Sequence, residues 1–133
     1  MVEFVYLGVL MLVPLIYLVL MVSRLQAGAF ATTQAAREAG RAFVTATSAE
    51  TAEARANAAA RIAFEDQGFR GGTSLVIDCD GLPCLRPEGR VEVTATVTVP
   101  LPLVPSFARR LVPLEIPVTA RHLSTVDRFR NAP

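Results

Sequence analysis

Cys79 and Cys84 are the only cysteines in the chain, and they lie in the segment CDGLPC with four residues between them. A redox-active pair more often has the spacing C-x-x-C, and a zinc site needs four ligands, more than two cysteines and the single His122 supply. We therefore expect a structural disulfide that closes the intervening turn, with two reduced thiols as the alternative. So short a loop would give a stabilisation of about 2 kcal/mol.

Other side chains capable of metal or catalytic chemistry lack suitable neighbours. Asp78 and Asp80 precede Gly81 without the ligand spacing of a calcium loop, so we expect ordinary turn residues. His122, beside Arg121, has no nucleophile and acid at a recognisable catalytic spacing, and we expect a surface or partly buried histidine. We predict no catalytic residue, no metal or cofactor, no small-molecule substrate and no nucleic acid partner; the chain is not expected to be an enzyme.

An apolar stretch near the beginning of the chain must position everything else. Residues Phe4 to Val22 read FVYLGVLMLVPLIYLVLMV without a charge, within a 133-residue chain of net charge +1. As a helix this stretch is about 28 Å long, which matches the hydrocarbon core of a bilayer. The sequence predicts a transmembrane anchor, with room beyond it for one small domain.

A cleaved signal peptide is the alternative to a retained anchor. A signal has a basic start, a shorter apolar run and a small-residue cleavage site, and the segment LMVSRLQAG offers only a poor one, so a retained anchor is favoured. Arg24, just after the span, would by the positive-inside rule place the C-terminus in the cytoplasm. The cysteine pair and the strand-rich C-terminal part favour the opposite orientation, and we expect a short basic leader before Met1 in the gene.

Glu3 stands immediately before the apolar stretch. Its carboxylate has two interpretations: it lies in the lipid headgroup region, or it pairs with a cationic group of a neighbouring subunit, because a charge held in lipid is costly until it is partnered. Within the span, Pro14 removes one backbone hydrogen bond and is expected to kink the helix.

Two helices are predicted. The first continues past the span to Val44, in a stretch without proline that carries small residues at helical spacing, among them Gly28 and the pair Ala36 and Gly40. The second follows Thr47-Ser48-Ala49-Glu50, which has the spacing of a capping box, and ends near Gly68. Its apolar side is expected to comprise Ala52, Ala56, Ala59, Ala60, Ala63 and Phe64.

Three strands are predicted after the second helix. Residues 73–79 are β-branched and apolar, residues 90–99 alternate almost strictly, and residues 114–126 alternate less cleanly around Pro117, which indicates an edge strand or a bulge. Between the last two strands, four prolines at 100, 102, 105 and 113 bracket one short helical turn, and the end of the chain from Asp127 is expected to be frayed.

These elements predict a membrane-anchored α+β protein shaped like a lollipop. Residues 1–23 form the transmembrane anchor, residues 24–46 continue the same helix outside the membrane, and residues 47–133 form a small extracytoplasmic head. A three-stranded antiparallel sheet is too small to stand alone, so we expect the second helix and the upper part of the first to cover its apolar face.

The order of these features resembles the TadE-like family, pilin-like minor components of tight-adherence pilus systems. The resemblance rests on Val2-Glu3-Phe4 before an apolar run with an internal proline, on QAAREAGRAF at Gln34 to Phe43, and on a β-rich region ending in Val-Thr-Ala-Arg. It implies a prepilin-like protein, trimmed by a dedicated peptidase and held in the bacterial cytoplasmic membrane, which helps to start or regulate filament assembly.

The resemblance further implies partners: the membrane, pilus platform proteins, and other pilins or pseudopilins. The acid early in the family's apolar segment corresponds to Glu3. The helix-packing positions are expected to be Glu3, Gly8, Pro14, Gly28, Ala36 and Gly40. A membrane-anchored sensor or ligand-binding module is the alternative function, and it requires a pocket with convergent polar groups.

Overall fold

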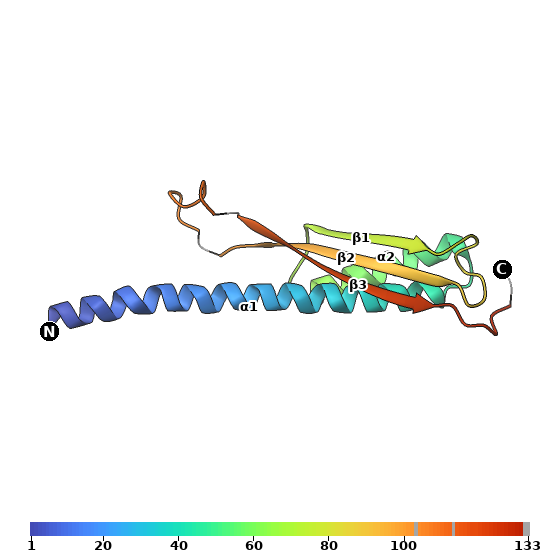
Figure 1. Cartoon of the computed structure of the whole chain (residues 1–133), viewed down its shortest axis with the longest axis horizontal. Helices are drawn as coiled ribbons and strands as arrows, with labels where there is room; N and C mark the ends of the chain where they lie inside the picture. The colour runs from blue at the N-terminus through green and yellow to red at the C-terminus, as the bar shows by residue number, and fades with distance from the viewer. Residues whose placement is uncertain (103, 113, 132–133) are drawn as a thin grey trace.

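A computed structural model describes residues 1–102, 104–112 and 114–131. Pro113, predicted to bracket the short turn, and the last two residues of the predicted head lie outside the described residues. The elements follow the order α1 (Val2–Val44), α2 (Ala49–Asp66), β1 (Thr73–Cys79), β2 (Arg90–Pro100) and β3 (Glu115–Thr125). Figure 1 shows a long helical stem whose far half carries a small head, so the predicted α+β lollipop is confirmed.

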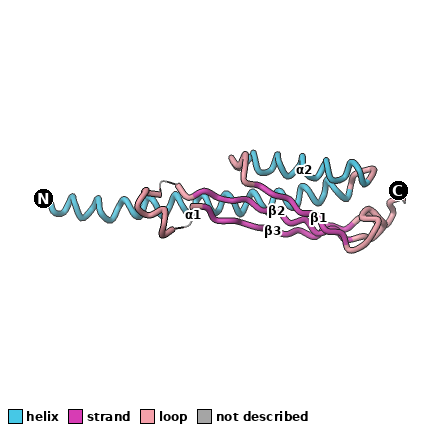
Figure 2. The backbone as a smooth tube through the Cα atoms, turned by 90° about the horizontal axis from the view of Figure 1, so that it is seen from above, coloured by secondary structure: helices cyan, strands magenta, loops and turns pink. Residues whose placement is uncertain are grey.

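α1 is a single helix of 43 residues, about 65 Å long. It runs through Pro14 without interruption, and neither Figure 1 nor Figure 2 shows a sharp bend at that level. Proline removes one intrahelical hydrogen bond, but the helix continues on both sides with strongly helix-forming leucines and alanines. α1 therefore joins the apolar segment to the head as one rigid element.

The half of α1 within the head has one buried stripe of small residues. Their spacing of three and four residues places them on the same side of the helix. Thr32 is fully buried, and its hydroxyl donates to the backbone carbonyls of Gly28 at 3.0 Å and Ala29 at 3.1 Å, so it leaves no unsatisfied polar atom. The buried residues are Gly28, Ala31, Thr32, Ala35, Ala36, Ala39, Gly40 and Phe43.

α2 begins one residue later than the predicted capping box implies. Ser48, not Thr47, is the N-cap, and its hydroxyl accepts a hydrogen bond from the backbone N–H of Thr51 at 3.3 Å and contacts the Thr51 hydroxyl at 2.9 Å. The Thr51 hydroxyl also donates to the Ser48 carbonyl at 3.1 Å, so a hydroxyl residue, and not Glu50, stands at the third helical position after the N-cap. α2 ends before Gly68, whose φ of +83° suits a residue without a side chain, as predicted.

α2 packs mainly on α1, and it contacts the sheet only weakly, at β1. Figure 2 shows α2 beside α1 while the strands lie over α1. The predicted apolar side of α2 is buried except for Ala59, which is half-buried. The sheet is therefore covered chiefly by α1, and α2 packs on one flank of α1. The alanines on both helices let α1 and α2 approach each other closely.

The sheet has the order β1-β2-β3 and is antiparallel throughout. The strict alternation predicted for β2 is confirmed: its five inward residues are fully buried, and they are Val91, Val93, Ala95, Val97 and Val99. Pro117 pairs with Thr98 in an unbroken register on β3, an edge strand, so no bulge is needed.

The direction of the strands relative to α1 follows from two close contacts. A methyl group built on Gly28 would lie 2.6 Å from Val99 Cγ2, and one built on Gly40 would collide with the Ser124 hydroxyl. β2 thus runs antiparallel to α1 and β3 runs parallel to it. The β2–β3 loop consequently lies at the end of the head nearest the apolar segment, and the β1–β2 loop lies at the opposite end.

The prediction that the chain is frayed from Asp127 is wrong for the residues up to Arg130, which are held against the head. The Arg130 guanidinium donates to the carbonyl of Val44 at 2.9 Å and to that of Ala46. These carbonyls belong to the C-terminal end of α1 and the turn after it, where unpaired acceptors and the helix dipole favour a cation. Val126 is also buried, and its backbone pairs with Gly89.

Replacing Gly28 by alanine should destabilise the head, because Val99 is buried and its β-branched side chain has little freedom to move. We expect the free energy of unfolding to fall by about 1–2 kcal/mol, overpacking exceeding the gain in helix propensity. Gly8→Ala is the matched control, since a methyl group there meets nothing within 4 Å. Thermal unfolding of the full chain in detergent micelles measures both; equal behaviour of the two variants would contradict the close contact.

Candidate functional site

The apolar half of α1, Val2 to Val22, is the most exposed hydrophobic surface of the described chain. Its large side chains project on all sides of the helix, and none of an 18-residue stretch within it is buried. α1 is the one helix in the described part that is long and apolar enough to cross a membrane. The large side chains exposed here are Val2, Phe4, Val5, Tyr6, Leu7, Val9, Leu10, Met11, Leu12, Val13, Leu15, Ile16, Leu18, Val19, Leu20 and Val22.

Glu3 and Pro14 lie on the same side of α1, whereas Gly8 lies on another. At about 100° per residue, Pro14 is only about 20° around the helix from Glu3, and Gly8 is about 140° away. The side that carries Glu3 and Pro14 continues into the head as the side that carries Gly28 and faces the sheet. The predicted contact positions in the span are therefore not one continuous surface.

Glu3 occupies the first turn of α1, where the helix dipole favours an anion. It is exposed, with Tyr6 and Leu7 beside it on the helix. The salt bridges found among residues 1–102, 104–112 and 114–131 are Arg61–Glu65, Arg86–Asp80 and Arg121–Glu92. Glu3 therefore has no cationic partner within that part of the chain.

The other three predicted helix-packing residues have partners inside the head. Gly28 lies against Val97, Val99 and Val118, and Gly40 lies against His122 and Ser124. The Ala36 side chain is fully buried. These three positions pack α1 against its own sheet and α2, so a neighbouring subunit cannot reach them in this fold. The roles predicted for Glu3, Gly8 and Pro14 stay predictions.

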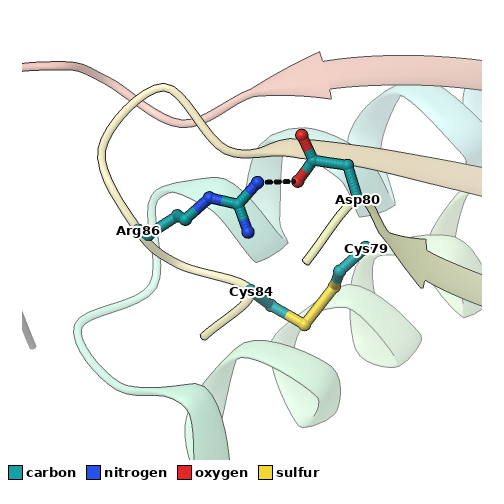
Figure 3. Close-up of polar contacts among 4 residues, drawn as sticks. All are labelled: Cys79, Asp80, Cys84 and Arg86. Atoms are coloured by element: carbon teal, nitrogen blue, oxygen red, sulfur yellow. Dashed lines mark hydrogen bonds and ion pairs between the residues drawn. A yellow bond between two sulfur atoms is a disulfide. The ribbon is translucent and has the colours of Figure 1, made fainter. Parts of the chain in front are cut away.

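Cys79 and Cys84 form the expected disulfide at the end of the head farthest from the apolar half. Their Cα atoms are 5.4 Å apart, and the bond closes the start of the β1–β2 loop, as Figure 3 shows. Leu85, immediately after the bridge, is 1% exposed and anchors the loop in the core. The loop is thus fixed by a covalent bond and by an apolar side chain.

Polar contacts also hold this loop. The Arg86 guanidinium donates to Asp80 Oδ1 at 2.9 Å (Figure 3), and the Glu88 N–H donates to the carbonyl of Val126. Both partners of the ion pair are more than a third exposed, so solvent screening limits its contribution to between about 0 and 1 kcal/mol. Asp80 is therefore a turn residue with a neighbouring arginine, in line with the expectation from its position.

His122 is half-buried on the inner side of β3, next to Gly40 of α1, which is the partly buried position expected for it. Asp78 is exposed on the outer side of β1. Within the described ranges, no three His, Cys, Asp or Glu side chains gather closely enough to share a metal ion.

A shallow hollow lies between α2 and β1. Its walls include Asn57, Arg61 and Phe64 from α2 and Leu75 from β1. Arg61 is the only charged residue that lines it, and this side chain lies 4.0 Å from Glu65 on the same helix. The hollow thus has an amide and a cation on the α2 wall and the hydroxyl residues Thr73 and Ser74 on the β1 wall, and all of these residues are exposed to solvent rather than enclosed around a ligand.

The β2–β3 loop was expected to contain one short helical turn, and it has a second feature that sequence reasoning missed. Its turns include hydrogen bonds from the N–H groups of Leu111 and Val112 to the carbonyl of Ala108. Phe107 is 81% exposed and Leu111 is 86% exposed, in a loop whose Pro105 lies against the apolar half of α1. Two signals could have placed this loop near the apolar half of α1: it joins the two antiparallel strands β2 and β3, and its sequence is rich in apolar residues.

Comparison with protein-family models, curated proteins and solved structures gives no match for this chain. The chemistry of the site therefore follows from its geometry. Transfer of apolar surface out of water is favourable by about 25 cal/mol per Å². The exposed apolar half of α1 is therefore stable only with lipid or other apolar helices around it. The architecture is pilin-like: an apolar N-terminal helix and a disulfide-bonded head.

Replacing both Cys79 and Cys84 by serine should lower the free energy of unfolding of the head by about 2 kcal/mol, the value for so short a closed loop. Amide exchange within residues 80–89 should accelerate more than exchange in α1. Reducing agent should reproduce both effects in the wild type and change nothing in the double variant. A response of the double variant to reductant would show that the loop is not what the reagent acts on.

Proposed function

We propose that this chain is a non-enzymatic, TadE-like pseudopilin or minor pilin that takes part in the assembly of a tight-adherence pilus or a related secretion machine. The apolar half of α1 anchors it in the bacterial cytoplasmic membrane. The head lies on the extracytoplasmic side. Its partners are other pilin-like subunits and the membrane-embedded platform proteins of the machine.

One observation carries the proposal: α1 has two uninterrupted halves with opposite surroundings. The first half is exposed except for the half-buried Tyr17 and Met21, and the second is buried along a stripe against the chain's own sheet. A helix that only anchored a domain would not need to be continuous with the core of that domain. Continuity lets a force or a displacement on the span pass directly to the head, which suits a subunit that is moved out of a membrane during assembly.

The disulfide supports the extracytoplasmic placement of the head. Disulfides persist in oxidising compartments such as the bacterial periplasm, and Cys79–Cys84 lies at the end of the head most distant from the apolar half. The arginine after the span, Arg24, points to the opposite orientation by the positive-inside rule. We give more weight to the disulfide, because a single arginine beside the span is a weak determinant of membrane orientation.

Glu3 is the residue proposed to mediate lateral assembly. It lies at the end of the span away from the head, and it lacks a cationic partner in the described part of its own chain. An unpaired carboxylate near lipid costs free energy, up to about 3 kcal/mol at the centre of a span and less at its end. Pairing with a cation of a neighbouring subunit would recover that energy only in the assembled state.

A sensor or ligand-binding role is less well supported by the head. The hollow between α2 and β1 is open and bounded by alanine and phenylalanine on the α2 side. Polar residues line both of its walls, Asn57 and Arg61 of α2 and Thr73 and Ser74 of β1, but the hollow is shallow, and its one charged side chain, Arg61, is 72% exposed to water.

Glu3→Gln should reduce co-purification of the protein with pilus components, and reduce piliation, several-fold in a host that builds such pili. Glutamine keeps the size of the side chain and removes the charge, so the loss would report the ion pair. The measurement is affinity capture from solubilised membranes, together with electron-microscopic counting of filaments.

Glu38→Gln is the matched control, because Glu38 is an exposed glutamate on the head half of the same helix. This variant should assemble like the wild type. Both variants should remain in the membrane fraction. Normal assembly by Glu3→Gln would mean that the carboxylate has no part in the contact, and an equal loss in both variants would point to a general defect of α1.

A further inference from the structure

The β2–β3 loop returns along α1 toward the beginning of the chain. Figures 1 and 2 both show it extending beyond the sheet, over the apolar half of the helix. Pro105 of the loop lines one shallow apolar groove together with residues of α1 that lie between Val13 and Met21. These α1 residues occupy the last turns before Val22, so the loop reaches about 10 Å below the head-side end of the span.

The exposed side chains of the loop combine apolar groups with positive charge. Phe107 and Leu111 are more than four-fifths exposed, and Leu114 is 47% exposed. Arg109 and Arg110 stand between them, are exposed and take part in none of the ion pairs of the described residues. The nearest acids in the sequence, Glu92 and Glu115, lie outside the loop.

The backbone of the loop is suited to an interface of low polarity. Its prolines carry no N–H donor, and the turn at Ala108 pairs the donors of Leu111 and Val112. The Leu101 N–H bonds to the carbonyl of Leu114, which closes the base of the loop. An irregular loop cannot lie in the hydrocarbon core with its donors unpaired, but partial satisfaction permits a position at the headgroup boundary.

We propose that the β2–β3 loop inserts into the headgroup region of the extracytoplasmic leaflet, with Phe107 and Leu111 in the acyl boundary and Arg109 and Arg110 on anionic phosphates. The occupant of this surface is the bilayer that contains α1. This inference rests on the proposed membrane anchoring of α1. It adds a second contact that fixes how high the head stands above the membrane and which side of the head faces it.

Two observations favour lipid over a protein partner. The loop lies beside the apolar half of α1, so a bilayer that surrounds residues 13–21 also surrounds the loop. Adjacent arginines with apolar neighbours complement anionic headgroups above an acyl layer, the pattern of interfacial membrane segments. Insertion by about 5–10 Å is typical of such segments and agrees with the depth that α1 implies.

The absence of tryptophan from the sequence allows a direct test. Phe107→Trp, Tyr17→Trp and Leu82→Trp each introduce a single tryptophan, in the loop, in the span and in the exposed disulfide loop respectively. The full chain is reconstituted in vesicles of phosphatidylethanolamine and phosphatidylglycerol that contain lipids brominated near the top of the acyl chain. Phe107→Trp should be quenched several-fold more strongly than Leu82→Trp, and its emission should be shifted to the blue.

The span variant separates the two proposals. If Tyr17→Trp is not quenched by lipids brominated deeper in the chain, α1 is not inserted, and the anchoring fails together with this inference. If Tyr17→Trp is quenched and Phe107→Trp behaves like Leu82→Trp, the anchoring stands and the loop contact is wrong. A blue-shifted Phe107→Trp that brominated lipid does not quench would mean that protein, such as a second copy of the chain, covers the loop.

The arginines are tested in the Phe107→Trp background. Arg109→Gln combined with Arg110→Gln should reduce quenching in anionic vesicles to the level seen in phosphatidylcholine vesicles. Arg61→Gln, at an exposed arginine on α2, should leave quenching unchanged. Equal quenching of the loop in anionic and zwitterionic vesicles before any arginine is changed would overturn the assignment of Arg109 and Arg110 to phosphate.

Discussion

The fold depends on how closely α1 can approach the sheet. A three-stranded sheet and two helices bury little apolar surface in so small a head, and the buried side chains on α1 are almost all alanine and glycine, each of which buries little area. Close contact compensates, because dispersion falls steeply with distance. No side chain at Gly28 holds α1 away from the valines of β2, and none at Gly40 holds it away from Ser124 and His122 of β3. The same small residues that a membrane helix uses to meet a neighbour here serve an intramolecular contact.

This close contact also fixes the polarity of the head. Val99 lies on Gly28, whereas Ser124 lies on Gly40, so β2 descends toward the apolar half and β3 rises from it. The loop that joins them must therefore lie at the membrane end. The loop that contains the disulfide must lie at the far end, beside the α1–α2 turn, where Arg130 pairs with the last carbonyls of α1. The two loops consequently meet different environments, which matches their chemistry: exposed apolar and cationic side chains on one, a covalent crosslink and an anchored leucine on the other.

Local pattern was sufficient for the elements and set the bounds of α2 and the strands to within about two residues, because β2 alternates with period two and α1 repeats small residues every three or four positions. It was insufficient where the outcome depends on competition or on distant partners. Thr47 and Ser48 both suit an N-cap, and the local pattern does not decide that Ser48 takes this position. Arg130 is polar and near the end of the chain, and from sequence these properties predict fraying. In the structure, the end of α1, far away in sequence, supplies hydrogen-bond acceptors for it. The small residues at Gly28, Ala36 and Gly40 predict helix packing without indicating whether the partner is another chain or this one.

The side of α1 that faces the sheet offers a last constraint on assembly. Followed toward the beginning of the chain, this side passes through Tyr17 and Pro14 to Glu3, at intervals that keep it within about 40° of one line. The β2–β3 loop lies over its head-side part, and Tyr17 and Met21 are accordingly half-buried, whereas Glu3 and its neighbours are fully exposed. A neighbouring subunit approaching from this side can therefore contact the turns around Glu3, away from the head, while the loop covers the turns next to the head. The lateral contact proposed for Glu3 and the lipid contact proposed for the loop use separate stretches of one helix side, so both can exist in the same molecule.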